Sequence, residues 1–528
     1  MHRKILQVEL TCLGLFLALA SQAQPVITSQ PTNQSVLANV TNTGLSVAAT
    51  GVGLFSYQWT LNGTNLPNNI ITTIGIGGGF AGDGGAATNA RFNAPAAIVS
   101  DANNNIFIAD TMNSRIRKIG TNGIINTIAG TGIQGYTGDG GAATSARIGT
   151  PYGIAVDAGG NVFFADFYPG GGPGSRIRRI STNGIISTVV GTNASSYAGD
   201  GGLATSAQIR LTSVGGPCSL CFDGGGSLYI ADYGNNRVRK VSTNGFIVTI
   251  AGNGSTSYAG DGSFATNSGL SSGVNSVFVD NNGNILISTT TEIYKVDTNN
   301  VIIKIAGGGA SLVDGALATN SWIFPTGLLT DTSGNIYFGD SRDTRRGVHK
   351  IDTNGILTTI AGIGTSANNG DGGPATNAAM GCPYSIAFDG NKNLLIADEL
   401  WHVVRKVWFA GLPSIALKKL SPTMQGNYQV VVSNSGGSVT SAVAALSVSY
   451  PAISSFIFTN PSSRFTIQWP VFQPSTFQVQ WTTNLATGSW LNIGSTVTYS
   501  GTTNTVRALN DFSWVNYQQG FYRLVWLQ

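Results

Sequence analysis

Residues 151–190 read PYGIAVDAGGNVFFADFYPGGGPGSRIRRISTNGIISTVV, and this stretch decides the fold. It holds four short runs of apolar and β-branched residues, and turn-forming residues such as Gly, Asn and Ser separate each run from the next. The last two runs flank Asn183-Gly184, and Asn-Gly between apolar runs is the strongest short signal for a β-hairpin. The stretch therefore predicts four antiparallel strands joined by turns.

The same unit occurs six times in this 528-residue chain. Each copy begins with a Gly-Asp-Gly loop or a close variant, followed by an Ala-Thr pair, and successive loop aspartates lie 53 to 61 residues apart. These aspartates are Asp83, Asp139, Asp200, Asp261, Asp314 and Asp371. Repeated four-stranded units stack around an axis as the blades of a propeller. We therefore predict an all-β chain with a six-bladed β-propeller over residues 69–410.

The repeated unit also carries a family resemblance. Pro383-Tyr-Ser-Ile-Ala-Phe-Asp389, Ser227-Leu-Tyr-Ile-Ala-Asp232 and Arg237-Val-Arg-Lys-Val241 resemble NHL repeats, in the variety of secreted bacterial proteins that has Gly-Asp-Gly-Gly loops. The resemblance covers roughly residues 70 to 409, and blades four and five match it least well. It implies a six-bladed propeller of the NHL type.

The ends of the repeat region predict how the ring closes. Residues 69–74 have the sequence of a fourth strand but precede the first blade, whereas the sixth blade stops after its third strand, Val403–Val407. We therefore predict that residues 69–74 complete the sixth blade.

The segments on either side of the propeller predict one divided domain. Residues 24–68 contain Trp59, and residues 411–450 contain Tyr428 two residues before Val430. The two segments resemble the halves of an immunoglobulin-like sandwich, in which Tyr428 takes the place of the corner tyrosine and Val430 that of a disulfide cysteine. We therefore predict a propeller inserted in an immunoglobulin-like domain.

Residues 451–528 alternate apolar and polar residues again, as in Phe465-Thr-Ile-Gln-Trp469 and Phe477-Gln-Val-Gln-Trp481. Alternation with a period of two is typical of strands that have one buried face. We predict a C-terminal β-sandwich of fibronectin type III-like character.

The N-terminus predicts export. Met1-His2-Arg3-Lys4 is basic, an apolar run follows to Ala20, and Ser21-Gln22-Ala23 offers the small residues of a cleavage site. We expect a signal peptide over residues 1–23 that is cut after Ala23, and a secreted, periplasmic or cell-surface protein. No later run approaches the roughly 18 apolar residues of a membrane span, so we expect none.

Charge argues against a nucleic-acid partner, although some NHL propellers bind RNA. Only 10% of the residues are charged, and the formal net charge is +4. Most acidic residues and about half of the basic ones recur at equivalent positions of the six units. A residue that every blade repeats serves the architecture, so we expect these charges to pair between blades.

Ligands for a metal ion are scarce after the signal segment. The histidines there are His349 and His402, and the glutamates are Glu292 and Glu399. A zinc site or a Glu-led calcium site is therefore poorly supplied, and no Ser/His/Asp motif is present. We expect no catalytic residue, no metal and no cofactor.

The cysteines do not predict a disulfide. Cys218 and Cys221 fall on the first strand of blade three with side chains on opposite faces, and Cys382 enters blade six across the ring. We expect unpaired thiols and a monomer.

Four aromatic residues are the candidate binding residues. Phe80, Tyr136, Tyr197 and Tyr258 each stand three residues before a loop aspartate. Either they form an arc that stacks on a sugar or holds a peptide, or each ring packs on its own loop, and we favour the second interpretation. We predict a non-catalytic binding or adhesion protein that recognises an extracellular glycan or protein through the propeller face. The alternative is a hydrolase or lyase that uses a metal ion in the channel.

Overall fold

The structure is a computed structural model that describes residues 23–527 outside a set of short ranges. Those ranges are 38–42, 53, 67, 169–173, 193, 212–218, 272, 343–345, 410, 418–419, 421–423, 450–454, 460–463, 472–474, 483–490, 500–504 and 510–520. After residue 454 only the backbone of the strands is described. Residues 1–22 of the predicted signal segment, and Cys218, lie outside the described residues.

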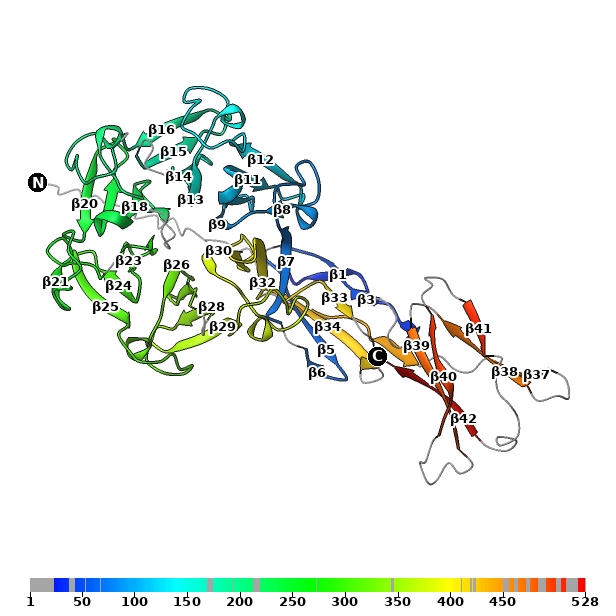
Figure 1. The fold of residues 1–528 in the computed structure, drawn as a ribbon. Coiled ribbons are helices and arrows are strands. Elements are labelled where there is room, and N and C mark those ends of the chain that lie inside the picture. The colour runs from blue at the N-terminus through cyan, green and yellow to red at the C-terminus, as the bar shows by residue number, and fades with distance from the viewer. Residues whose placement is uncertain are drawn as a thin grey trace, which may run out of the picture. The chain divides into compact units, whose positions relative to one another are not determined.

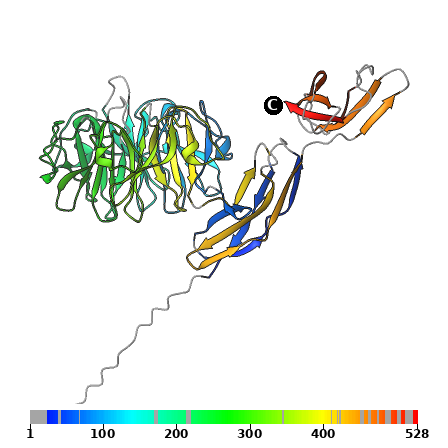
Figure 2. The same ribbon diagram turned by 90° about the horizontal axis from the view of Figure 1, so that it is seen from below.

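The chain divides into two compact units, residues 67–411 and the segments that flank them. The first unit is a ring of six β-sheets (Figure 1). Seen edge-on, its strands run between the two faces of the ring (Figure 2). The predicted all-β fold with a six-bladed propeller is confirmed. Within the described ranges, no helix is long and apolar enough to cross a membrane.

Each blade is an antiparallel sheet whose strands follow the order of the chain. Blade 1 contains β9 (Pro95–Ser100), β10 (Ile106–Asp110), β11 (Arg115–Ile119) and β12 (Ile125–Ala129); blade 2 contains β13 (Thr150–Val156), β14 (Val162–Phe167), β15 (Arg176–Ile180) and β16 (Ile186–Val190). Blade 3 contains β17 (Leu220–Phe222), β18 (Leu228–Asp232), β19 (Arg237–Val241) and β20 (Ile247–Ala251); blade 4 contains β22 (Ser276–Val279), β23 (Ile285–Ser288), β24 (Glu292–Val296) and β25 (Val301–Gly307), with β21 (Ser263–Phe264) at its edge. Blade 5 contains β26 (Pro325–Thr330), β27 (Ile336–Asp340), β28 (Arg346–Ile351) and β29 (Leu357–Gly364); blade 6 contains β30 (Pro383–Phe388), β31 (Leu394–Asp398) and β32 (Val403–Trp408). Single turns of 3-10 helix are η1 (Ala87–Asn89), η2 (Thr111–Asn113), η3 (Ala143–Ser145), η4 (Ala204–Ser206), η5 (Tyr233–Asn235), η6 (Ala318–Asn320) and η7 (Ala375–Asn377).

The sixth blade is completed by a strand from the start of the ring. Strand β7 (Ile70–Gly77) pairs antiparallel with β32, and Ile71 lies opposite Val407. The short strand β8 (Arg91–Phe92) follows β7 in the same sheet. The predicted closure of the ring is confirmed.

Apolar clusters join each blade to the next. In one cluster Ala97 and Phe107 of blade 1 pack with Ile154 and Phe164 of blade 2, and all four are buried. Burial stabilises by about 1.5–3 kcal/mol for each large side chain. The ring is therefore held by contacts between neighbouring blades.

The Gly-Asp-Gly loops lie along the outer strands. The Gly84 N–H donates to the Ile125 carbonyl at 2.8 Å, and the Ala87 N–H donates to the Gly123 carbonyl at 2.9 Å. Isolated bridges repeat this contact in other blades, for example between Ala142 and Ile185. The loops thus cover strand edges that would otherwise be open to pairing with another chain.

Buried arginines connect these loops to the blade interior. Arg117 donates to Asp83 of the loop at 2.8 Å and to Asp110 at the end of β10 at 3.2 Å. Arg178 and Arg239 repeat the contact with both partners, and Arg405 repeats the loop contact. The prediction of pairing between blades is wrong for these pairs. Each loop folds back onto the blade that follows it, so its carboxylate meets an arginine of the same repeat.

The second unit is formed by strands from both flanking segments. Strand β5 (Ser56–Leu61) pairs antiparallel with β34 (Gly426–Asn434), and Trp59 lies opposite Val430. The Tyr428 hydroxyl donates to the Met424 carbonyl at 2.6 Å, and Trp59 and Tyr428 share one buried cluster. The other strands here are β1 (Val26–Ser29), β2 (Gln34–Leu37), β3 (Thr43–Ser46), β4 (Ala48–Thr50), β6 (Thr64–Asn65), β33 (Ser414–Leu417), β35 (Gly437–Thr440) and β36 (Ala444–Ser449). The immunoglobulin-like assignment stays a prediction.

The C-terminal strands form two three-stranded sheets, ordered β37-β38-β41 and β40-β39-β42. They are β37 (Ser455–Thr459), β38 (Arg464–Val471), β39 (Ser475–Thr482), β40 (Leu491–Tyr499), β41 (Thr505–Leu509) and β42 (Phe521–Leu527). The fibronectin type III-like assignment also stays a prediction.

Candidate functional site: the central channel

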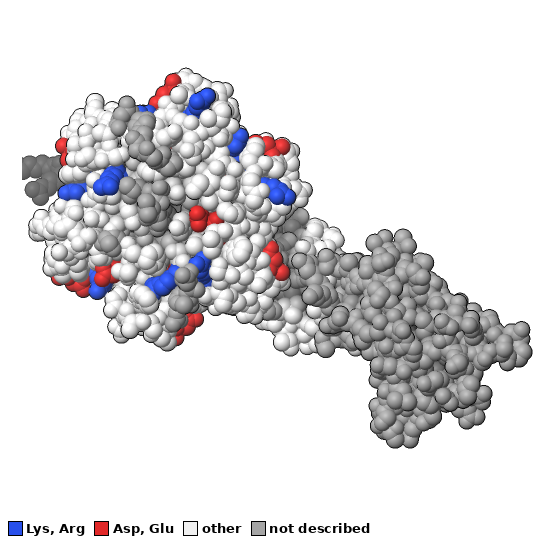
Figure 3. Space-filling view, viewed as in Figure 1, with Lys and Arg blue, Asp and Glu red and all other residues white. Residues whose placement is uncertain are grey.

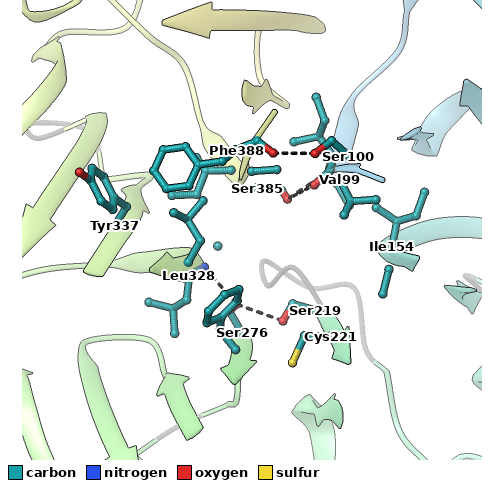
Figure 4. A pocket seen from close by; sticks show the side chains of 18 of the residues that line it. Val99, Ser100, Ile154, Ser219, Cys221, Ser276, Leu328, Tyr337, Ser385 and Phe388 are labelled. Atoms are coloured by element: carbon teal, nitrogen blue, oxygen red, sulfur yellow. Dashed lines mark hydrogen bonds between the residues drawn. The ribbon is translucent and has the colours of Figure 1, made fainter. Parts of the chain in front are cut away.

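A channel runs along the axis of the ring. It encloses a cavity of about 610 Å³, and the first strands of all six blades contribute to its wall (Figure 4). Strand β30 carries residues of both ends, because Tyr384 and Phe388 both line the cavity. We call the two ends the Tyr384 end and the Phe388 end.

The middle of the channel is aliphatic. The fourth residue of each first-strand motif lines the cavity and is almost fully buried, and we call this set the aliphatic belt. Its members are Ile98, Ile154, Leu220, Val277, Leu328 and Ile386. Branched side chains suit this position because they fill the crowded centre of a twisted ring and favour strand backbone.

Serines one residue before the belt join neighbouring blades. The Ser276 hydroxyl donates to Ser219 Oγ at 3.0 Å, and Ser276 Oγ accepts from the Leu328 N–H at 3.2 Å (Figure 4). Ser385 Oγ accepts from the Ile98 N–H at 3.2 Å across the seam between blades six and one. These contacts between blades assign the hydroxyls a structural role.

The Phe388 end is aromatic. Phe388 lies edge-on to Tyr337 with ring centroids 5.3 Å apart, and Phe409 stacks near both. Phe222 and Phe278 also line this part of the cavity. The Tyr337 hydroxyl donates to Asp331 at 3.1 Å, and burial raises the pKa of that phenol.

The Tyr384 end is polar by contrast. Tyr152 and Tyr384 line the cavity from blades two and six. Burial raises the pKa of the Tyr384 phenol, and the phenol also interacts electrostatically with Glu399, Cys382, Tyr152 and Tyr233. Phenols from three blades, a thiol and a carboxyl group therefore interact electrostatically around this end of the channel.

Hydrogen bonds hold Glu399 and Cys382 in place at the Tyr384 end. The Glu399 N–H donates to the Cys382 carbonyl at 2.9 Å, which holds the loop after β31 against the start of β30. Arg346 of blade five donates to the Gly381 carbonyl at 2.9 Å and contacts Cys382 Sγ at 3.4 Å. Burial raises the pKa of the Cys382 thiol to about 11, so the sulfur is a neutral neighbour at physiological pH.

The four predicted binding residues lie elsewhere, each on its own blade. The Arg115 guanidinium lies 3.7 Å from the ring centroid of Phe80, and Arg237 lies 3.7 Å from that of Tyr197. Arg176 lies 4.8 Å from the ring of Tyr136. Contacts of this kind between a cation and an aromatic face are attractive, so the rings pack on third-strand arginines.

Tyr258 differs because blade four has no arginine at that place. Its ring packs on Tyr294 with centroids 4.9 Å apart, and its hydroxyl donates to Asp261. Among the described residues, no ring contact joins any two of the four predicted aromatics, and none of them lines the channel. Each of the four rings thus packs within its own blade. Their role in ligand binding stays a prediction.

The rare histidines and glutamates of the chain do not converge. His402 Nδ1 accepts from the Ala94 N–H at 2.8 Å, and His349 Nδ1 lies 3.2 Å from Thr359 Oγ1. Glu292 accepts hydrogen bonds from Ser271 and Tyr294 in blade four. In the part of the chain that the structure describes, no three His, Cys, Asp or Glu side chains are grouped to hold a metal ion.

The two described cysteines, Cys221 and Cys382, are unpaired thiols. Cys221 packs against the apolar cluster between blades three and four, and burial raises its pKa to about 12. The tyrosines at the Tyr384 end were not among the binding residues that the sequence predicted. A signal was present, because Tyr152 and Tyr384 both follow the proline that opens a first strand.

Comparison with known proteins finds several similar chains. The family model described as the teneurin NHL domain matches residues 132–197. Teneurin-4 of Mus musculus is 32% identical over 161 residues, which cover 28% of this chain and only 6% of that relative's length. An auxiliary nutrient binding protein from Bacteroides ovatus is 14% identical, with 73% of this chain and 97% of that chain covered and a TM-score of 0.46. A streptogramin B lyase is 12% identical, with 67% and 97% covered and a TM-score of 0.35. Residues 67–411 thus form a six-bladed β-propeller, and residues 132–197 within it match the model of the teneurin NHL domain.

Proposed function

We propose that this chain is an extracellular binding protein without catalytic activity, and that its propeller recognises a partner protein. The observation that carries the proposal is a set of exposed apolar side chains on the connections beside the Tyr384 end. We call this set the apolar patch, and it consists of Ile76, Met112, Leu400 and Trp401.

The apolar patch spans the seam between blades six and one. The Trp401 carbonyl lies 2.6 Å from the place where Gly77 would carry a Cβ, so the Trp401 turn touches the end of β7. The Met112 N–H donates to the Asn93 carbonyl at 3.0 Å, and the next residue, Ala94, donates to His402. Apolar side chains that gather on a surface instead of lying singly mark sites of protein association.

The polarity of the ring also favours a protein over a glycan. Charged side chains are sparse on the face that Figure 3 shows. Sugar sites combine exposed ring faces with polar groups that fix the hydroxyls. The predicted aromatics offer less of this, because arginines already occupy one face of Phe80, Tyr136 and Tyr197.

The alternative of a hydrolase or lyase with a metal ion in the channel has weaker support. The aliphatic belt supplies no acid, base or metal ligand, and the channel serines already bond between blades. Metal analysis of the purified protein tests this alternative. A stoichiometric metal ion in the purified protein would favour the hydrolase or lyase.

A peptide selection tests the proposed function. Phage that display random peptides are selected on the purified protein and on a variant with Met112→Ser and Leu400→Ser, residues that are 51% and 41% exposed. The matched control carries Val313→Ser and Phe264→Ser, which remove side chains that are 54% and 60% exposed on other blades. Thermal unfolding checks that all three proteins fold.

We expect the wild type and the control to capture the same peptides, and the patch variant to bind them about tenfold more weakly or worse, because truncation of a central apolar contact costs more than 1 kcal/mol. Equal capture by the patch variant would contradict the assigned surface. Capture of glycans on an array, lost on replacement of Tyr136, Tyr197 and Tyr258 by Ala, would favour the predicted aromatics instead.

A further inference from the structure

One acidic side chain of this protein differs from all the other described ones. The described aspartates and Glu292 all accept hydrogen bonds or form ion pairs. Loop aspartates meet arginines or hydroxyls, strand-ending aspartates accept backbone N–H groups, and turn aspartates cap their own turns. Of the acidic residues that the structure describes, Glu399 alone has a carboxylate with neither kind of partner.

Glu399 is half-buried at the Tyr384 end of the channel. Burial raises the pKa of its carboxyl group, His402 lowers that pKa and Asp398 raises it. The nearby Asp398 is itself occupied, because it accepts from the Gly381 and Cys382 N–H groups at 2.7 and 2.9 Å. A partly buried carboxylate is costly when no donor meets it, and no described residue donates to this one, which points to a partner from outside the chain.

Aromatic rings surround the same place. The Tyr384 and Glu399 N–H groups both donate to the Cys382 carbonyl, at 2.8 and 2.9 Å, so the two residues are neighbours. Tyr384 and Tyr152 line the cavity, and the Tyr384 phenol interacts electrostatically with Glu399, Tyr152 and Tyr233. The face of a phenol ring is electronegative, and an alkylammonium or guanidinium group gains both from ring faces and from an adjacent carboxylate. Three phenols and one carboxylate form an environment suited to an organic cation.

The apolar patch indicates where such a cation comes from. Leu400 and Trp401 follow Glu399 directly in the chain, and both are exposed. A free small amine would make little use of this apolar rim. A protein that covers the patch would bring its own side chains to the channel mouth. Arginine is among the residues enriched at interface hot spots, which lie in enclosed pockets surrounded by contacts that exclude water.

We propose that Glu399, Tyr152, Tyr233 and Tyr384 form a binding site for a positively charged side chain, lysine or arginine, of the partner protein. The site rests on the proposed function, because it gives that partner a basic residue at the centre of the surface that covers the apolar patch.

Ligand-observed NMR on the full purified chain tests the site with three small probes. They are the N-acetyl methylamides of lysine, arginine and norleucine, and norleucine has an apolar chain of similar length without the charge. We expect the lysine or the arginine probe to bind at least about tenfold more tightly than norleucine, since a charge-assisted hydrogen bond is worth that ratio or more. The better of the two identifies the basic residue of the partner.

Two variants with the same charge change separate a site effect from a general one. Glu399→Gln keeps the shape of the side chain and, since the carboxylate has no partner within the described residues, should not disturb the fold. Asp297→Asn removes a carboxylate from the turn after β24, where it caps its own turn. We expect Glu399→Gln to reduce binding of the basic probe about tenfold, to the level of norleucine, and Asp297→Asn to leave it unchanged.

A third variant tests the rings. Tyr384→Leu removes the aromatic face but keeps an apolar side chain. It should weaken binding of the basic probe several-fold and leave binding of the norleucine probe unchanged. Equal binding of lysine, arginine and norleucine, unchanged binding to Glu399→Gln, or no binding of either basic probe up to about 20 mM would each overturn the site.

The two proposals fail in different ways. If the selection yields peptides that need the apolar patch but lack basic residues and bind Glu399→Gln equally well, the proposed function stands and the cation site is wrong. If the basic probes bind through Glu399 while no peptide is captured through the apolar patch, the cation site stands and the assigned protein-binding surface is wrong.

Discussion

Arg117 of β11 donates to Asp110 of β10 across 3.2 Å, and neither side chain has any exposed surface. The same guanidinium reaches Asp83 in the Gly-Asp-Gly loop at 2.8 Å, where the carboxylate is partly exposed. One arginine thus ties the interior of a blade to the loop that covers its outer edge. Buried ion pairs of this kind are sensitive to the loss of one partner.

Replacement of Arg117 by Met should therefore lower the free energy of unfolding by about 3–5 kcal/mol, because Asp110 is left buried and unpaired. Denaturant unfolding measures the loss. Blade four supplies the matched control, because it carries Tyr294 and Thr289 where blade one carries Arg117 and Asp110. The double variant Arg117→Tyr with Asp110→Thr should cost less than the single one. A double variant that is less stable than Arg117→Met would contradict the role of the pair.

Gly82 and Gly84 of the first loop should respond differently to alanine. Both have positive φ, at 97° and 80°, so a side chain strains either backbone by about 1–2 kcal/mol. At Gly82 a Cβ would also lie 2.7 Å from the Cα of Ala90, whereas nothing lies within 4 Å at Gly84. Gly82→Ala should thus destabilise the chain by more than Gly84→Ala in the same thermal unfolding assay. The reverse order would show that the loop does not pack on Ala90 as described.

Asp200 should make stability depend on pH in acid. Burial pushes its pKa up, but hydrogen bonds from Thr249 and Tyr197 and the charge of Arg239 outweigh this effect, so the pKa lies below its usual value. The stabilisation is therefore present above the unfolded pKa of about 3.9 and is lost as the pH falls through the lower folded value. Asp200→Asn should lower the unfolding temperature at pH 7 and match the wild type near pH 2. A constant difference between the two proteins over this range would contradict the linkage.

The thiols should be unreactive in the folded protein. Burial raises the pKa of Cys221 to about 12 and that of Cys382 to about 11, so almost no thiolate is present at pH 8. Iodoacetamide at pH 8 should leave both residues unmodified in the native chain and alkylate both in denaturant, as read by peptide mass spectrometry. Rapid modification of native Cys382 would mean that the Tyr384 end is more open to solvent than its burial indicates.

The blades and the closure of the ring were predictable because their signals are local. Asn-Gly turns and period-two strands recur in each unit, and a lone fourth strand at residues 69–74 leaves the sixth blade as the place where it pairs. The path of the Gly-Asp-Gly loops was not predictable in the same way. Asp83 follows β7, which completes blade six, and precedes blade one in sequence. Only the backbone bond from Gly84 to Ile125 decides which blade its carboxylate meets.

The amino-acid sequence by itself determined the all-β class, the six blades and the strand that closes the ring, because hydrogen-bonded hairpins and repeated packing faces depend on neighbours in the chain. Only the tertiary structure decided the character of the channel. Tyr152 and Tyr384 lie far apart in sequence and meet because the ring brings the first strands of separate blades to one axis. That Glu399 has no hydrogen-bond or ion-pair partner among the described residues is also a tertiary property, because it depends on every group that the fold places around the carboxylate.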